Sequence, residues 1–134
     1  MVKEVIFMSR EQAEAATPSA NWAVISIHDY YQDPANLKDG WQAVLQVGFY
    51  DEDLAIPGLE SFSSEQADTV VSFIERVAPT VDGILVHCNY GISRSAAMAK
   101  YIALSYGLWF PADYNRFNKR VYRKLLERST STPG

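Results

Sequence analysis

The sequence contains little of what several large classes of protein need. It has one cysteine and two histidines, so an internal disulfide is excluded and a metal cluster would have few ligands. No hydrophobic run approaches the ~20 residues of a membrane-spanning helix. Twelve Lys and Arg stand against sixteen Asp and Glu, which gives a net charge of −4. We therefore expect no metal or other cofactor, and neither nucleic acid nor a membrane as a partner.

The first residues also lack the features of a secretory signal. Residues 1–4 include Lys3 and Glu4, and only a short apolar segment follows them. A signal peptide needs a longer apolar core than this. A reactive thiol without a disulfide partner fits a reducing compartment, so we expect a cytoplasmic protein.

What is present is the composition of one ordinary globular domain. A chain of 134 residues, of which 48% are hydrophobic and 21% charged, can build a single packed core. The sequence has no internal repeat and no low-complexity segment. We assign residues 1–128 to one domain and residues 129–134 to a flexible tail.

Apolar runs alternate with segments of helical periodicity along the chain. The apolar runs predict strands at residues 5–8, 22–27, 44–47 and 83–86. The helical patterns predict helices at residues 9–15, 63–77, 95–104 and 111–128, and a Ser-x-x-Gln capping box opens each of the first two. Strands that alternate with helices predict a three-layer α/β domain around a mainly parallel sheet.

The only cysteine lies between the fourth predicted strand and a helix. Backbone N–H groups of a tight loop that opens a helix form an anion site, and the helix N-terminus favours a thiolate or a phosphate. We therefore expect Cys88 to be a nucleophile at neutral pH. Arg94 can reach across the loop and hold two phosphate oxygens with its planar guanidinium. The competing interpretation is a buried core cysteine, which is the ordinary state of a lone Cys.

These residues resemble a known signature. His87-Cys88, five residues and then Arg94-Ser95 resemble the HC-x5-R-S motif of the cysteine-dependent protein tyrosine phosphatases, and residues 91–95 resemble its dual-specificity branch. The resemblance implies a phosphatase-like catalytic domain with a four-stranded sheet in the order 1-4-2-3. It implies hydrolysis of phosphotyrosine, and in a shallow pocket also of phosphoserine and phosphothreonine, through a phosphocysteine intermediate. A phosphatase of small non-protein esters and a catalytically weak phosphate-binding or interaction module are the alternatives.

The same resemblance implies roles for the residues of this segment. Cys88 would attack the phosphorus, while Arg94 and the loop amides would bind the phosphate. His87 would fix the loop and the thiolate, and Ser95 would offer its hydroxyl to the sulfur when the intermediate breaks down. The phosphate-binding loop would comprise Cys88, Asn89, Tyr90, Gly91, Ile92, Ser93 and Arg94.

The resemblance also implies an aspartate general acid in a loop well before the cysteine. Asp51 and Asp53 follow the third strand, and the carboxyl ends of parallel strands lie at one edge of a sheet. We prefer Asp51 because it directly follows the aromatic pair at residues 49–50, and Asp53 is the alternative. The His28-Asp29 pair is interpreted as structural, because adjacent side chains on a strand point to opposite faces.

Overall fold

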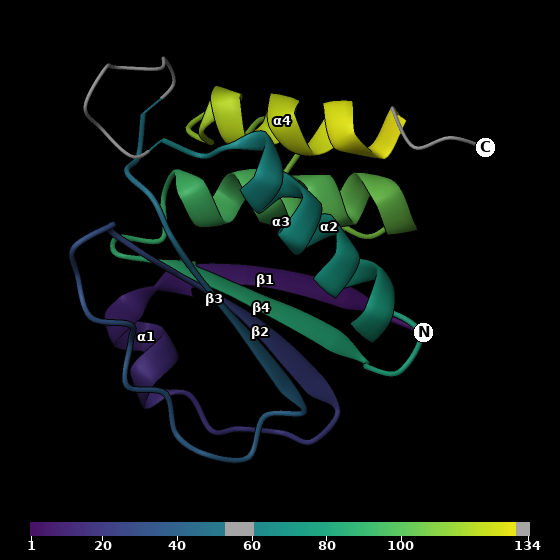
Figure 1. Ribbon diagram of the computed structural model, residues 1–134. Coiled ribbons are helices and arrows are strands. Elements are labelled where there is room, and N and C mark those ends of the chain that lie inside the picture. Colours follow the sequence, from purple (N-terminus) through teal and green to yellow (C-terminus); the bar gives the residue numbers. More distant parts are fainter. Residues whose placement is uncertain (53–60, 131–134) are drawn as a thin grey trace.

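A four-stranded sheet lies at the centre of the molecule, with helices on both of its faces (Figure 1). The computed structural model describes residues 1–52 and 61–130. The strands are β1 (Glu4–Ser9), β2 (Trp22–His28), β3 (Ala43–Gly48) and β4 (Gly83–Cys88). The helices are α1 (Arg10–Ala15), α2 (Ser64–Val77), α3 (Arg94–Tyr106) and α4 (Lys119–Thr130). The predicted α/β class is confirmed.

The sheet has the order β1-β4-β2-β3, and all its neighbouring strands are parallel, as predicted. Every residue of β4 is buried, and so are the five inner residues of β2. Central parallel strands are covered on both faces, which is why these segments read as nearly continuous apolar runs. Because the strands are parallel, their carboxyl ends meet at one edge, where Cys88 is paired with Ser9 and His28 with Gly48.

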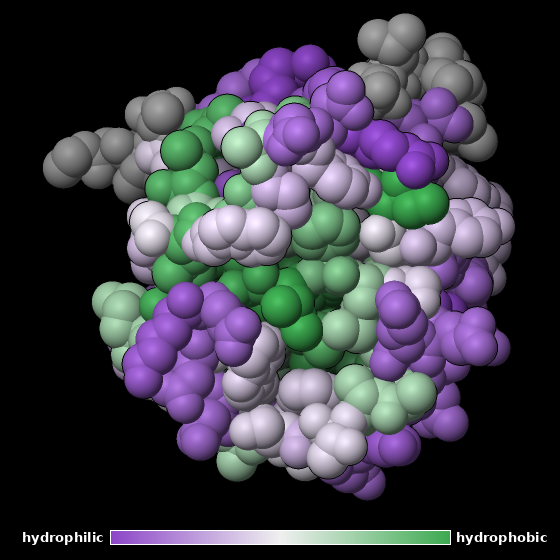
Figure 2. Space-filling view, turned by 180° about the vertical axis from the view of Figure 1, so that it is seen from behind, coloured by the Kyte–Doolittle hydropathy of each residue, from purple (hydrophilic) through white to green (hydrophobic). Residues whose placement is uncertain are grey.

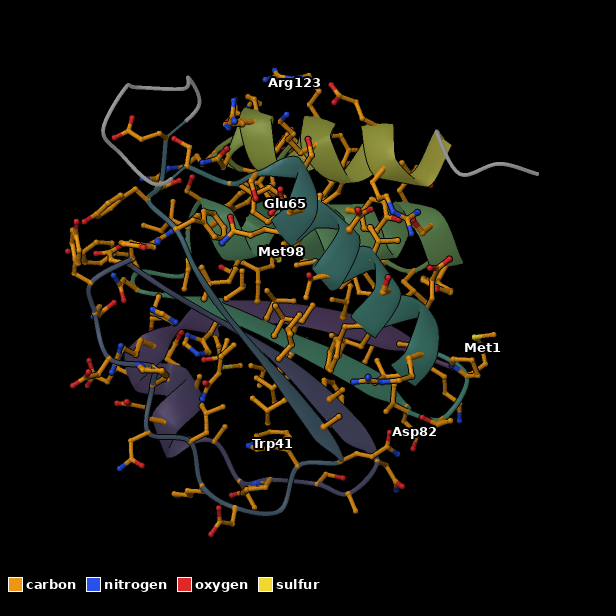
Figure 3. All side chains as sticks on the ribbon, in the orientation of Figure 1. Met1, Trp41, Glu65, Asp82, Met98 and Arg123 are labelled. Atoms are coloured by element: carbon orange, nitrogen blue, oxygen red, sulfur yellow. The ribbon has the colours of Figure 1, made fainter. Side chains whose placement is uncertain are left out.

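The helices divide unequally between the two faces. α1 packs against β1 and β4 on one face, where its Ala13 meets Val24 and Leu85 in a small core. α2 and α3 cover the other face, and α4 lies on those two helices, away from the sheet (Figure 1). Met98 of α3 is fully buried and lies between the helices and the sheet (Figure 3). The main core is therefore the layer between the sheet and the α2–α3 pair.

Two helix starts agree with their capping signals. The Ser9 side chain accepts a hydrogen bond from the backbone of Gln12, whose own side chain returns to the Ser9 backbone. Ser63 and Gln66 make the same reciprocal pair at the start of α2. Such boxes satisfy N–H groups that a helix start otherwise leaves without partners.

The predicted last helix was wrong at its start. It was expected at residues 111–128, but α4 begins at Lys119, and the segment before it forms turns. Asn118 ends that segment, and its Oδ1 accepts a hydrogen bond from the Val121 N–H at 3.0 Å. Asparagine is among the best N-cap residues, and hydrophobic periodicity alone does not locate a cap. α4 continues to Thr130, past the predicted boundary, and residues 131–134 of the predicted tail lie outside the described residues.

Some hydrophobic side chains reach the surface. From behind, they gather across the middle of the face that Figure 2 shows. The most exposed large ones among the described residues include Leu104 and Trp109, near the end of α3 and after it. None of the helices in the described ranges is long and apolar enough to cross a membrane.

Candidate active site

The predicted strand, loop and helix around the cysteine are all present. Cys88 ends β4, residues 89–93 form a loop, and α3 begins at Arg94. The Cys88 side chain is 3% exposed, and its Sγ lies 3.1 Å from Oγ of Ser95 in the first turn of α3. The thiol therefore lies at the base of the loop, with a hydroxyl group beside it.

Gly91 allows this loop to pack against the end of β1. Its φ of +73° lies in the left-handed region that only glycine adopts freely. A Cβ atom here would lie 2.4 Å from the carbonyl carbon of Met8 and 2.5 Å from the nitrogen of Ser9. The Arg10 N–H also donates to the Asn89 carbonyl at 3.3 Å. The loop is thus held from below by the β1–α1 turn.

The backbone amides of the loop have unused hydrogen-bonding capacity. Across residues 1–52 and 61–130, none of the N–H groups of residues 90–94 donates to a backbone carbonyl. Ser93 precedes α3 but makes no side-chain cap to it. A curved row of such N–H groups at a helix N-terminus is an anion-binding concavity. Phosphate binding by residues 88–94 stays a prediction.

Arg94 is held from one side and has unused donor capacity on another. Its Nη1 donates to Oδ1 of Asp29 at 2.9 Å and to the Phe49 carbonyl at 2.6 Å. Its Nε is buried and has no hydrogen-bond partner among the described residues. A buried donor without a partner is costly, so this edge of the guanidinium is suited to a ligand oxygen.

Asp29 is a site residue that the sequence interpretation missed. It was given only a structural role, yet it forms the ion pair with Arg94. The signal was available, because Asp29 follows the end of β2 just as Asp51 follows the end of β3. The carboxyl ends of parallel strands meet at one edge of the sheet, and this reason for choosing Asp51 holds equally for Asp29.

Asp51 contacts the loop directly. Its Oδ1 accepts a hydrogen bond from Oγ of Ser93 at 2.8 Å and another from Nδ2 of Asn118 at 2.7 Å. The carboxylate itself is exposed. Asn118 was not predicted as a site residue, because its segment was expected to be helical. The alternative, Asp53, lies outside the described residues.

His87 lies beneath the loop and is fully buried. Its Nε2 is 2.6 Å from Oγ of Ser26 on β2, and its Nδ1 makes a long 3.5 Å contact to the Cys88 carbonyl. A carbonyl can only accept, so Nδ1 carries the proton and Nε2 accepts from the Ser26 hydroxyl. Burial lowers the pKa of His87 to about 4, against the Cys88 hydrogen bond, which raises it. This imidazole is neutral at physiological pH and supports the loop.

The remaining loop residues differ in their surroundings. Tyr90 is 81% exposed, whereas the Asn89 Oδ1 is buried without a partner among the described residues. The Ile92 carbonyl accepts a short hydrogen bond from the Tyr114 hydroxyl. The loop is therefore fixed by residues on both sides of it, while its tip is open to solvent.

Comparison with known proteins bears on the fold. No protein-family model matches the sequence, and no curated protein matches it. Several solved structures are similar. Human DUSP28 superposes with a TM-score of 0.58 at 17% identity, over 95% of this chain and 92% of that one. The human tyrosine phosphatase-like serine/threonine/tyrosine-interacting protein gives 0.55 at 18% identity, over 83% and 78% of the two chains.

A third similar structure is a mouse protein named as a dual specificity phosphatase, complexed with zinc tungstate. It gives a TM-score of 0.55 at 16% identity, over 84% of this chain and 72% of that one. This chain therefore has a fold like that of these dual-specificity phosphatases and tyrosine phosphatase-like proteins. At these identities the likeness establishes the fold, and activity has to be argued from the site.

Proposed function

We propose that this protein is a cysteine-dependent phosphatase that hydrolyses phosphate monoesters in two steps. The proposal rests chiefly on one observation. Among the described residues, the N–H groups of the loop that follows Cys88 donate to no backbone carbonyl, and the buried Nε of Arg94 beside them has no partner. Such a concentration of unused donors around a thiol is suited to a tetrahedral dianion.

In the first step the Cys88 thiolate attacks phosphorus and a sulfur–phosphorus bond forms. The bond from phosphorus to the ester oxygen breaks, and Asp51 gives that oxygen its proton. Charge spreads over the three equatorial oxygens of phosphate in this transition state. On this proposal the loop amides and Arg94 stabilise that charge as preorganised donors, which keeps the reorganisation small.

In the second step a water molecule attacks the phosphocysteine. The Asp51 carboxylate takes a proton from this water, phosphate leaves, and the sulfur–phosphorus bond breaks. The Ser95 hydroxyl, 3.1 Å from Sγ, stabilises the departing thiolate by a hydrogen bond. The overall reaction consumes one water and needs no oxidant or reductant.

We propose phosphorylated proteins or small phosphate esters as substrates, and phosphotyrosine before phosphoserine and phosphothreonine. A reactive thiol of this kind works in a reducing compartment, which supports a cytoplasmic location. One similar structure carries the name of an interacting protein, so a binding module that lacks turnover is the second candidate. The intact Cys88, Arg94 and Asp51 favour the enzyme.

The test is hydrolysis of p-nitrophenyl phosphate by the purified protein in the presence of EDTA. We expect turnover in the wild type, none in Cys88→Ser, and inhibition by vanadate. Asp51→Ala should lose a factor of about 10²–10⁴ on a phenyl ester, because proton transfer to the leaving oxygen is lost. Tungstate binding by calorimetry separates the two candidates. Binding without turnover would favour the module, and turnover retained in Cys88→Ser would overturn the mechanism.

A further inference from the structure

Asn118 links three parts of the site. Its backbone N–H donates to the Ser93 carbonyl at 3.0 Å, and its Nδ2 donates to Oδ1 of Asp51 at 2.7 Å. Its Oδ1 accepts from the Val121 N–H and so caps α4. The side chain is 2% exposed although it is polar. One residue thus joins the phosphate loop, the carboxylate and the start of a helix.

These contacts determine which way the amide group faces. The Val121 N–H can only donate, so the amide oxygen must face it, and the amide nitrogen must then face Asp51. A second contact, from Nδ2 to the Glu52 carbonyl at 3.3 Å, uses the same nitrogen as a donor and agrees with this orientation. Asn118 therefore presents a donor to the carboxylate and cannot present an acceptor without losing the cap.

The donors also determine which carboxyl oxygen is available for the reaction. Oδ1 of Asp51 accepts from both Ser93 and Asn118. Within the described chain no hydrogen bond is found to Oδ2. A carboxyl oxygen that accepts two hydrogen bonds is poorly placed to carry a proton as well, so the proton of the acid form belongs on Oδ2.

We propose that Asn118 is a positioning residue for the general acid: it holds Asp51 against the phosphate loop and directs its protonated oxygen to the leaving group. This inference rests on the proposed function, since it assigns Asn118 a part in the same reaction. The cost of misplacing an acid by about 1 Å can reach roughly a hundredfold in rate. Asn118 itself touches neither the thiol nor, on this proposal, the substrate.

Two substitutions at this position separate positioning from helix capping. Serine is as good an N-cap as asparagine, but its shorter side chain cannot also reach Asp51. Asn118→Ser should therefore keep α4 and lose the contact to the carboxylate. Asn118→Ala loses both. Ser63→Ala is the matched control, because it removes the N-cap of α2 and with it about 1 kcal/mol, without a contact to Asp51.

The readout is the dependence of kcat on the leaving group. Nitrophenolate leaves well without a proton, whereas phenolate needs one, so loss of a general acid shows mainly on phenyl phosphate. We expect Asn118→Ser to lower kcat on phenyl phosphate by about ten- to a hundredfold, with a much smaller loss on p-nitrophenyl phosphate. KM should change little. Ser63→Ala should not lower kcat on either ester.

A double-mutant cycle tests whether Asn118 acts through Asp51. In an Asp51→Ala background, Asn118→Ser should cost nothing further on phenyl phosphate. Equal losses on the two esters, or full additivity with Asp51→Ala, would overturn the proposal while leaving the phosphatase mechanism intact.

A crystal structure of Asn118→Ser gives a result that does not depend on turnover. We expect the Asp51 side chain to leave Ser93 or to become disordered there, and an unchanged carboxylate would overturn the positioning role. A wild type that hydrolyses neither ester would instead refute the proposed function, and Asn118 would then have no catalytic part.

Discussion

The loop after β4 and the residues that surround it are built in different ways. The loop is contiguous: Cys88, the free amides and Arg94 fall within seven residues. Its supports, the residues around it, come from three separate segments, with Ser26 and Asp29 in and just after β2, Asp51 after β3, and Asn118 before α4. The nucleophile and the phosphate-binding groups of the proposed reaction are local in the sequence, whereas its general acid and its positioning residues are brought together only by the fold.

This difference has an energetic consequence. On the proposed function the loop binds an anion through its backbone N–H groups, which depends on the backbone conformation that Gly91 permits. The supports act instead through individual side-chain contacts, each replaceable at a cost in orientation. We therefore expect substitutions of Cys88 and Arg94 to lower activity strongly, and substitutions of the positioning residues Asp29 and Asn118 to lower it less.

A large effect, short of the complete loss expected for Cys88→Ser, should follow from Arg94→Lys. An ammonium group cannot donate to Asp29 and the Phe49 carbonyl and also offer a second edge to the phosphate. We expect kcat/KM to fall by about 10²–10³, as for loss of a transition-state donor, and tungstate binding to weaken. Steady-state kinetics and calorimetry measure the two effects. Arg76 is an exposed arginine on α2, and Arg76→Lys is the control. A comparable loss in this control would mean that the loss in Arg94→Lys does not depend on the phosphate loop.

The loop and the supports also differ in how far the sequence predicts them. The strands, their parallel order and the segment 88–95 could be predicted, because hydrophobic runs and a contiguous motif are local signals. Asp29 had only its place after β2 as a signal, and Asn118 could not be assigned in the same way. Each depends on a hydrogen bond between residues far apart in the chain, from Arg94 to Asp29 and from Asn118 to Asp51. Asn118 was further hidden by an amphipathic pattern that extends across the true start of α4.

A smaller effect, on stability and not on activity, should come from His87, which lies beneath the loop. Its pKa is about 4 in the folded protein, against about 6.5 in the unfolded chain. Between these values the unfolded state binds a proton that the folded state does not, so stability falls as the pH falls from about 6.5 to about 4. Above pH ~6.5 neither state binds it, and this contribution is constant.

This shift in the pKa of His87 corresponds to at most about 3 kcal/mol of unfolding free energy. Urea unfolding of the wild type and His87→Gln at several pH values between 4 and 7 measures it. The other titrating groups are common to the two proteins, so the difference between their curves isolates the imidazole. We expect the wild type to lose more stability than the variant on acidification. Parallel curves would mean that folding does not lower the pKa of His87.

The smallest effect should come from Asp29→Asn, because two consequences of this change oppose each other. Removing a carboxylate beside Arg94 favours any anion in the loop, yet the guanidinium loses the charge that orients its Nη1. Asp29 is 40% exposed on its side chain, so solvent screens the electrostatic gain. We therefore expect tungstate binding to be unchanged or slightly tighter, while kcat falls by about tenfold through poorer alignment in the transition state.

Asp82→Asn is the control for this change. Asp82 is an exposed partner of Lys3 at the opposite end of the sheet (Figure 3), and its loss should alter neither quantity. If Asp29→Asn weakens tungstate binding and kcat together, the carboxylate is needed to hold the loop itself. Asp29 would then belong with the loop residues, and the division between local chemistry and remote positioning would have to be redrawn. A fall in kcat alone would instead give Asp29 the same kind of role as Asn118. Asp29 would orient Arg94, as Asn118 orients Asp51.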